Sequence, residues 1–249
     1  MNLIEALTPK LPARIAIVGG GGKTTTLFQI GQQVQGLAWT TTTTHLGTDQ
    51  LGYADRHFLI ESVGQLDVQE LKAQKHSLIT GPFTPDERVH GPEAAVLQRL
   101  VELADQEKVS LIVEADGARS RALKAPEAHE PVIPAWAEMV IVLVGCSVLG
   151  KPLNDETVHR AQIFSSLTNL EMNEPIDPAA IMRMLIHPLG GLKGIPPSAT
   201  RVVLFNQADV LPDVDPLKQQ IPALLAGGYD KVIIGALAKH PNDLICMSK

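Results

Sequence analysis

A lysine and a threonine that follow four glycines are the residues of this chain best suited to chemistry. Glycines let the backbone turn with positive φ and bring no Cβ atom to block a close ligand. If a helix begins there, its free N–H groups and its dipole face an anion, and the lysine ammonium adds a full charge. The threonine hydroxyl is a suitable ligand for Mg²⁺. The sequence therefore predicts a phosphate-binding loop made of Gly19, Gly20, Gly21, Gly22, Lys23, Thr24 and Thr25.

The spacing of this motif is shorter than the usual one. The pattern G-x-x-x-x-G-K-[ST] would place its first glycine at position 17, which is Ile17. The pattern that fits is G-x-x-G-K-T from Gly19 to Thr24, which resembles the loop of the Mur ligases. A tight turn, or the glycine turn of a dinucleotide fold, would also contain such glycines. The Lys-Thr pair directly after them favours a nucleotide phosphate as the ligand.

Two acids follow the apolar run Val109–Val113, which is typical of a buried strand. Parallel sheets bind ligands beyond the carboxyl ends of their strands, so Glu114 and Asp116 are expected at the same edge as the glycine loop. A carboxylate there can hold Mg²⁺ or one of its waters, although an acid pair at a strand end can also be only a turn and a helix cap. We predict that Glu114 or Asp116 holds the metal together with Thr24, and that these acids and Lys23 are catalytic.

Basic residues follow these acids, in a proline-rich stretch that reads as a loop from Arg119 to Pro134. A run of charge is usually a solvated surface, but this one begins beside the predicted Mg²⁺ acids. We therefore predict that Arg119, Arg121 or Lys124 contacts an anionic substrate or the transferring phosphate, and we count Arg119 among the catalytic residues. Further candidates at the same edge are Thr40–His45 and His159–Arg160.

A possible base-reading motif, Asn206-Gln-Ala-Asp209, follows the apolar strand Arg201–Phe205. It resembles the N-K-x-D signature of GTPases, with Gln207 in place of the lysine. In that signature the aspartate accepts hydrogen bonds from guanine. Asn206 and Asp209 are therefore candidate nucleotide-binding residues, although Asn and Asp also favour plain turns. The sequence leaves ATP and GTP both open as the nucleotide.

Strands that alternate with helices must position these residues. The apolar patterns predict strands over residues 14–18, 37–40, 56–60, 76–80, 109–113, 139–144, 201–205 and 231–235. Helical patterns cover residues 2–8, 25–34, a polar segment between 60 and 76, 92–107, 155–167, 177–187 (with Asp177 as its N-cap) and 215–226. Continuous apolar strands that alternate with amphipathic helices indicate a mostly parallel sheet covered on both faces. The prediction is one α/β domain over residues 1–249, a three-layer, doubly wound sheet of P-loop NTPase type.

The composition is that of an ordinary globular protein, with 249 residues, 45% of them hydrophobic and 19% charged. A net charge of −6 gives no overall attraction to nucleic acid or to anionic lipid, so neither is expected as a partner. The uncharged, apolar stretch Met139–Gly150 is too short for a membrane span of about 20 residues, and the first residues are not expected to form a signal peptide. The two cysteines are expected to be buried, reduced thiols. We expect a cytoplasmic protein.

Taken in order, several motifs resemble those of the YqeC family. They are Val18–Thr25, Thr41–His45, Val113–Ala118, Lys124–Pro131 and Val158–Arg160. Members of that family are described as accessory proteins of selenium-dependent molybdenum hydroxylases, or as selenium cofactor biosynthesis proteins. The resemblance implies an NTP-dependent step in the maturation of a molybdenum–selenium cofactor or its enzyme. It also implies a molybdenum hydroxylase or a cofactor-biosynthesis protein as a partner, beside the nucleotide.

Three classes of function follow, in order of preference. The first is an Mg²⁺-dependent hydrolase of ATP or GTP whose turnover gates delivery to a client enzyme. The second is a Mur-ligase-like or kinase-like enzyme that activates a small substrate with the NTP. The third is a regulatory module that binds the nucleotide without turnover. Phosphate release separates the third class from the others, and stimulation by a small molecule rather than by a protein separates the second from the first.

Overall fold

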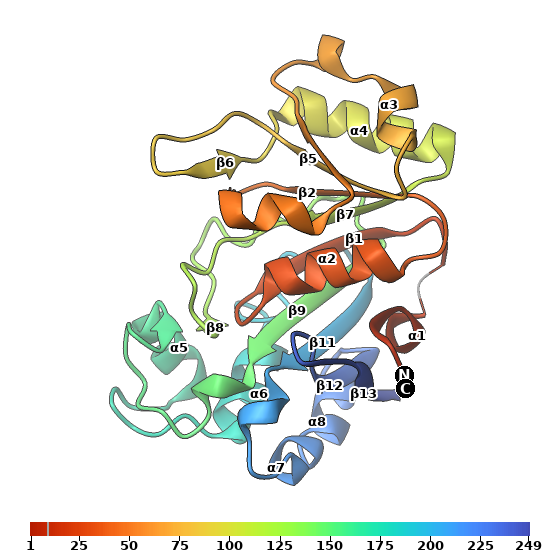
Figure 1. Ribbon diagram of the computed structural model, residues 1–249. Coiled ribbons are helices and arrows are strands. Elements are labelled where there is room, and N and C mark those ends of the chain that lie inside the picture. Colours follow the sequence, from red (N-terminus) through yellow and green to blue (C-terminus); the bar gives the residue numbers. More distant parts are fainter. Residues whose placement is uncertain (9) are drawn as a thin grey trace.

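A large, mostly parallel sheet organises the fold in the computed structural model, which describes residues 1–8 and 10–249 (Figure 1). Its nine strands lie in the order β13-β12-β11-β9-β1-β7-β2-β5-β4, and β13 is antiparallel to β12 whereas the other neighbours are parallel. The strands are β1 (Arg14–Gly19), β2 (Ala38–Thr42), β4 (Arg56–Leu59), β5 (His76–Thr80), β7 (Ser110–Glu114), β9 (Met139–Gly145), β11 (Thr200–Asn206), β12 (Lys231–Ala236) and β13 (His240–Ser248). The fold class is therefore α/β.

Two small sheets and a set of helices complete the described part of the chain. The small sheets pair β3 (His45–Gly47) with β6 (Arg88–His90), and β8 (Leu123–Lys124) with β10 (Val158–His159). The α-helices are α1 (Leu3–Leu7), α2 (Lys23–Gln33), α3 (Val68–Lys72), α4 (Ala94–Glu107), α5 (Ala161–Thr168), α6 (Pro178–Ile186), α7 (Asp215–Lys218) and α8 (Ile221–Ala226). Short 3₁₀ turns cover Thr48–Tyr53, Val63–Gln65, Cys146–Val148 and Ala208–Val210.

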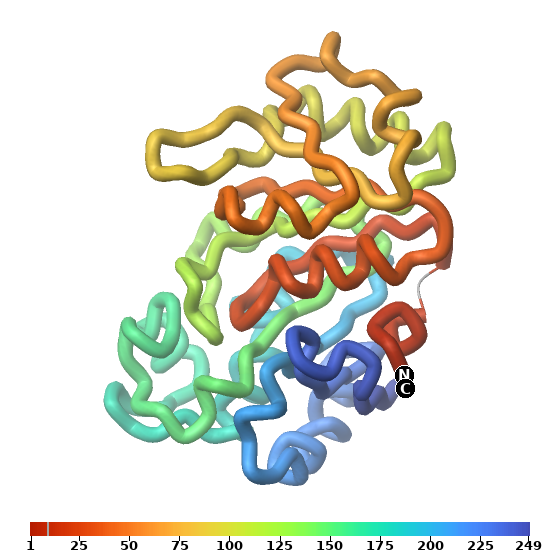
Figure 2. The backbone as a smooth tube through the Cα atoms, viewed as in Figure 1, coloured from red at the N-terminus to blue at the C-terminus, as the bar shows by residue number. Residues whose placement is uncertain are grey.

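Helices cover both faces of the large sheet, as the continuous apolar strands predict. Side chains alternate along a strand, so Ile15 and Ile17 of β1 pack with α1 and α2 on one face. Ala16 and Val18 pack on the other face, with residues of α5, α6 and α8. A further cluster around Trp39 places α3 and α4 over β2, β5 and β7. Figure 2 shows the first and last residues side by side, where the Leu244 N–H donates to the carbonyl of Met1.

The predicted strands all have counterparts whose ends differ by a residue or two. Asp177 caps α6 as predicted, since its side chain accepts a hydrogen bond from the Ala180 N–H at 2.6 Å. Cys146 is buried, Cys246 is half-buried, and both are free thiols. Among the described residues, no helix has both the length and the apolar content needed to cross a membrane.

The structure corrects three predictions on the second half of the chain. The helix expected over 155–167 begins only at Ala161, because Val158–His159 pairs with Leu123–Lys124 as a strand. That pairing also means that the stretch from Arg119 to Pro134 is not all loop. The helix expected over 215–226 is two short helices, and a proline lies at the start of each. Strand β13 was not predicted, because an edge strand that carries polar residues lacks an apolar run.

His76 provides a test of the fold through pH. Its ring lies in β5 against Gly31 of α2, its Nε2 is 2.9 Å from Thr40 Oγ1, and burial lowers its pKa to about 4. The unfolded chain binds a proton below about 6.5 and the folded chain only below about 4. The free energy of unfolding should therefore fall as the pH drops through this interval. We expect His76→Asn to reduce the slope of the free energy of unfolding against pH in this interval, as measured by urea unfolding at several pH values. The exposed-site control His240→Asn should leave that slope unchanged. Equal slopes in the two variants would contradict the assignment.

Candidate functional site

A cavity of about 950 Å³ lies at the carboxyl edge of the large sheet. Its walls come from the segments that follow β1, β2, β7, β9 and β11 and from the small sheet of β3 and β6. The lining residues are Gly21–Thr25, Thr44, His45, Gly47, Gln50, Arg88, Glu114, Gly117–Ala122, Ser147 and Gln207. The prediction that several motifs meet at one edge is confirmed for the glycine loop, Thr44–His45, Glu114 and Arg119–Arg121. This is where open α/β sheets place their ligands.

The glycine loop passes so close to its neighbours that none of its four glycines has room for a side chain. A Cβ atom on Gly21 would lie 2.3 Å from the Cα atom of Gly145, and one on Gly22 would lie 2.4 Å from Asn206 Nδ2. Both glycines also have positive φ, of 88° and 114°. The loop therefore depends on glycine for its path across the ends of β9 and β11.

The N–H groups of the loop fall into two sets. Those of Gly20 and Gly21 donate to the carbonyls of Leu143 and Arg121, at 3.0 and 3.1 Å. Those of Gly22–Thr25, at the start of α2, make no such bond to another group of the described chain. The first set fixes the loop to its neighbours. The second leaves a row of donors at the positive end of a helix, which suits a phosphate.

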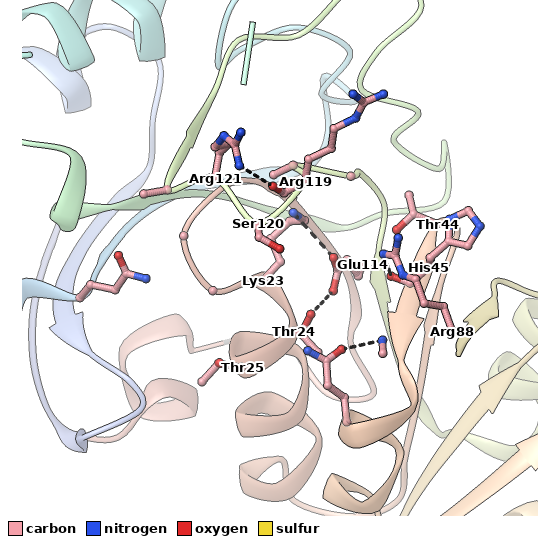
Figure 3. Close-up of a pocket in the computed structure, with 18 of the residues that line it drawn as sticks. Lys23, Thr24, Thr25, Thr44, His45, Arg88, Glu114, Arg119, Ser120 and Arg121 are labelled. Atoms are coloured by element: carbon pink, nitrogen blue, oxygen red, sulfur yellow. Dashed lines mark hydrogen bonds and ion pairs between the residues drawn. The ribbon is translucent and has the colours of Figure 1, made fainter. Parts of the chain in front are cut away.

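Lys23, Thr24 and Glu114 meet beside these donors, as Figure 3 shows. The Thr24 hydroxyl donates to Glu114 Oε2 at 2.9 Å, and Lys23 Nζ lies 3.6 Å from Glu114 Oε1. Lys23 also donates to the Gly19 carbonyl at 3.0 Å. Burial raises the pKa of the Glu114 carboxyl, while Lys23 and the Thr24 hydroxyl oppose that rise. The group thus joins a cation, a hydroxyl and a carboxyl at the N-terminal end of α2.

The donor atoms in this group fit Mg²⁺. Thr24 and Glu114 offer two hard oxygens close together, the ligand type that Mg²⁺ prefers. Within residues 1–8 and 10–249, no three His, Cys, Asp or Glu side chains come together as a metal cage. Mg²⁺ does not need one, because it keeps several waters and takes further ligands from substrate phosphates.

Asp116, the other predicted metal ligand, lies in a buried ion-pair cluster and does not line the cavity. Lys124 pairs with Asp116, lies 2.9 Å from Glu130, and donates to the Gly117 carbonyl at 2.6 Å. Arg160 joins the cluster through a bidentate pair with Glu130. Lys124 and Arg160, which were predicted to contact a substrate, are thus engaged with carboxylates. The cluster ties the segment after β7 to the small sheet of β8 and β10.

This cluster should make Asp116 a stability residue. Replacing Asp116 by Asn removes one of the two carboxylates that face the buried Lys124 ammonium. Breaking a buried pair in this way costs about 3 kcal/mol of the free energy of unfolding. We expect a loss of this size in urea unfolding, against less than about 0.5 kcal/mol for the exposed control Asp243→Asn. A fully stable Asp116→Asn variant would show that Lys124 does not depend on this carboxylate.

The predicted catalytic Arg119 lines the cavity together with Ser120 and Arg121. Arg119 and Ser120 both have positive φ, of 46° and 60°, in a tight turn over the glycine loop. Arg121 Nε donates to the Asp155 carbonyl at 2.9 Å. In Figure 3 the guanidinium groups of Arg119 and Arg121 point away from Lys23 and Thr24. The backbone of this turn therefore supports the loop, while its arginines face the outer part of the cavity.

The base-reading motif is placed near the glycine loop but is largely engaged with the protein. Asn206 is buried, and its Nδ2 donates to the Gly21 carbonyl at 2.9 Å while its Oδ1 accepts from the Leu237 N–H at 3.0 Å. Asp209 Oδ2 lies 2.7 Å from Lys239 Nζ. Neither residue lines the cavity, whereas Gln207 does. Asn206 supports the loop directly, and a role of Asp209 in base recognition stays a prediction.

The structure adds cavity residues that the sequence analysis did not single out. They are Gly47, Gln50, Arg88, Ser120, Ala122 and Ser147. For Arg88, the sequence did contain a local signal. In Arg88-Val-His90 polar and apolar residues alternate, as in a strand with one buried face, and the middle residue is indeed buried. Of the threonine run, Thr40–Thr42 is buried in β2 and hydrogen-bonded to the sheet, and only Thr44 and His45 reach the cavity.

Comparison with known proteins shows which family this chain resembles. A family model described as "YqeC protein" matches residues 15–162, which include the glycine loop, Glu114 and the ion-pair cluster. A protein of Escherichia coli (strain K12) named "Uncharacterized protein YqeC" is 26% identical over 250 residues, which cover 96% of this chain and 93% of that protein. No solved structure matches the chain significantly.

Proposed function

The chain belongs to the YqeC family, and from this premise we propose that it is an Mg²⁺-dependent nucleotide hydrolase of P-loop NTPase type. In this proposal it binds ATP or GTP and acts as an accessory protein in the maturation of a selenium-dependent molybdenum hydroxylase or its cofactor. The observation that carries the nucleotide part is the meeting of Lys23, Thr24 and Glu114 at the start of α2. The maturation part rests on the family resemblance alone.

Each residue of the group has a role in holding the triphosphate. The N–H groups of Gly22–Thr25 donate to phosphate oxygens, and the Lys23 ammonium turns from Glu114 and Gly19 to a phosphate oxygen. Thr24 and Glu114 hold Mg²⁺, which supplies positive charge where negative charge develops on the phosphates. Asn206 and the turn at Arg121 keep the loop in place from below and above. The chain thus contributes orientation and charge, which are the main needs of phosphoryl transfer.

A direct measurement tests this function. Purified protein should release phosphate from ATP or GTP in the presence of Mg²⁺ and cease to do so when EDTA is added. For the maturation role, the gene that encodes this chain should restore activity of a selenium-dependent molybdenum hydroxylase in a deletion strain, whereas a Lys23→Ala gene should not. Nucleotide binding without phosphate release would favour a regulatory module, and full hydroxylase activity in the deletion strain would remove the accessory role.

The choice of base gives a separate prediction. Asp209 stays ionised beside Lys239, which holds its pKa below the ordinary value. A carboxylate that accepts hydrogen bonds from guanine repels the N1 acceptor of adenine, so we expect GTP to bind at least about tenfold more tightly than ATP. Asp209→Asn should shift the preference toward xanthosine triphosphate, with Asp213→Asn as the control. Equal calorimetric affinities for ATP and GTP, unchanged in Asp209→Asn, would make Asn206–Asp209 only a turn and a loop support.

A further inference from the structure

The small sheet of β3 and β6 forms a wall of the cavity that is separate from the glycine loop. Its two strands pair antiparallel, with Arg88 opposite Gly47. The middle residue of each strand, Leu46 or Val89, is buried in a cluster with residues of α2 and β5. Because side chains alternate along a strand, this burial directs His45 and Arg88 to the opposite face. Apolar packing thus anchors a polar wall beside the phosphate loop.

Arg88 lies exposed at this wall, opposite the backbone of β3. Gly47, its cross-strand neighbour, has no side chain to displace the guanidinium, and one guanidinium nitrogen lies 3.5 Å from the His45 carbonyl. Figure 3 shows Arg88 reaching inward beside Thr44 and His45. Gln50 braces the same strand, since its Oε1 accepts a hydrogen bond from the Gly47 N–H at 3.1 Å.

The side chains that line the cavity carry more positive than negative charge. Four cations line the cavity, Lys23, Arg88, Arg119 and Arg121, against one carboxylate, Glu114. Mg²⁺ brings two positive charges of its own to a triphosphate, and Lys23 and the helix dipole add more. Arg88 stands on the wall of β3 and β6 rather than on the glycine loop, which makes it available to a second negative group.

These arginines also lack carboxylate partners within the chain. In the described part of the chain, none of the three lies within ion-pair distance of an acid. Asp86 interacts electrostatically with Arg88 without forming an ion pair. Its pKa is lowered first by the Thr84 hydroxyl and only to a smaller extent by Arg88. The arginines that do pair with acids are Arg14, Arg56, Arg99 and Arg160.

We propose that the wall around Arg88, Thr44 and His45 binds the oxyanion of a second substrate, a small molecule that carries a carboxylate or a comparable oxyanion group. The planar guanidinium fork suits such groups, and the Thr44 hydroxyl adds a donor. Burial, His90 and Arg88 lower the pKa of His45, so this ring is a neutral hydrogen-bonding partner. The inference rests on nucleotide binding in the proposed function and adds that a small anion is held beside the nucleotide.

Inorganic sulfate is a suitable probe for this site. The full-length protein is first saturated with Mg²⁺ and a non-hydrolysable β,γ-imido nucleotide, whose binding is measured by calorimetry, and is then titrated with sulfate. We expect one sulfate to bind per chain, and Arg88→Ala to weaken it by about tenfold or more, which is the usual effect of losing a charge-assisted contact. Arg88→Lys should restore part of the affinity. Arg99→Ala, which removes an arginine paired with Glu102 on α4, is the matched control and should bind sulfate like the parent.

The outcomes separate this inference from the function on which it rests. If the nucleotide fails to bind the parent protein, the proposed function fails and the inference fails with it. If the nucleotide binds but abolishes sulfate binding, sulfate occupies the phosphate loop and only the inference is overturned. Equal sulfate affinity in Arg88→Ala and Arg99→Ala would also overturn it.

Discussion

Replacing Lys23 by alanine is expected to weaken the binding of Mg²⁺–nucleotide by about 10- to 150-fold. The reason is the loss of a charge-assisted hydrogen bond to phosphate, worth about 1.5–3 kcal/mol, in a site where the ammonium is already oriented. Calorimetry with a non-hydrolysable nucleotide measures the effect without interference from turnover. Affinity equal to that of the parent would remove the glycine loop from nucleotide binding.

The burial of Lys23 requires a control that separates packing from charge. Lys23 is only 7% exposed, so alanine removes packing as well as charge. Lys23→Met keeps most of the side-chain volume without the ammonium, and it should lose nucleotide affinity to a similar extent. Lys218→Ala, which removes a lysine on α7, should bind the nucleotide like the parent. A Met variant with parental affinity would show that packing, rather than charge, explains the alanine result.

Replacing Glu114 by glutamine is expected to lower Mg²⁺-dependent phosphate release by about 100-fold or more, while nucleotide affinity changes by less than about tenfold. The amide keeps the shape of the side chain and removes the negative charge that holds the metal. Lys23 Nζ lies 3.6 Å from Glu114 Oε1 and keeps its hydrogen bond to the Gly19 carbonyl in this variant, so the amide should leave the protein folded. Single-turnover phosphate release, measured over a range of Mg²⁺ concentrations, separates a metal defect from a binding defect.

Asp116→Asn completes this comparison, because the structure gives the two acids different surroundings. Glu114 faces the glycine loop and Asp116 faces Lys124. We expect Glu114→Gln to lose turnover and keep its stability, and Asp116→Asn to lose stability and keep turnover per folded molecule. The opposite pattern, with turnover lost only in Asp116→Asn, would exclude Glu114 as the metal ligand.

The turn from β1 through the glycines into α2 was predictable because its signal is local. Glycines, a lysine and a threonine within seven consecutive positions, after a β-branched run, already specify a turn into a helix. The parallel sheet was predictable for a similar reason, since buried strands appear as continuous apolar runs. Neither prediction required knowledge of which segments pair over long distances.

The choice between Glu114 and Asp116 did require that knowledge. Both acids follow the same strand, and only the position of Lys124, which β8 fixes by pairing with β10, decides that Asp116 is buried in an ion pair. Strands of two residues leave no periodic pattern to detect. The place of Arg88 at the cavity was not predicted for the same reason. Its orientation follows from a three-residue strand that pairs with β3, about 40 positions earlier in the chain.

The position of β1 has a consequence for how the protein is made. Ile15 pairs with Ile112 of β7 on one side and Met139 of β9 on the other, so the strand that carries the glycine loop has no neighbouring strand from the first hundred residues. Leu143, which accepts from Gly20, leaves the ribosome roughly 6–24 s after Lys23 at the usual rates of synthesis. Asn206, which supports Gly21, follows later still. A nascent chain thus carries the glycine-lysine-threonine motif long before it has the segments that hold the loop in place, and the complete cavity forms only after β11 has been made.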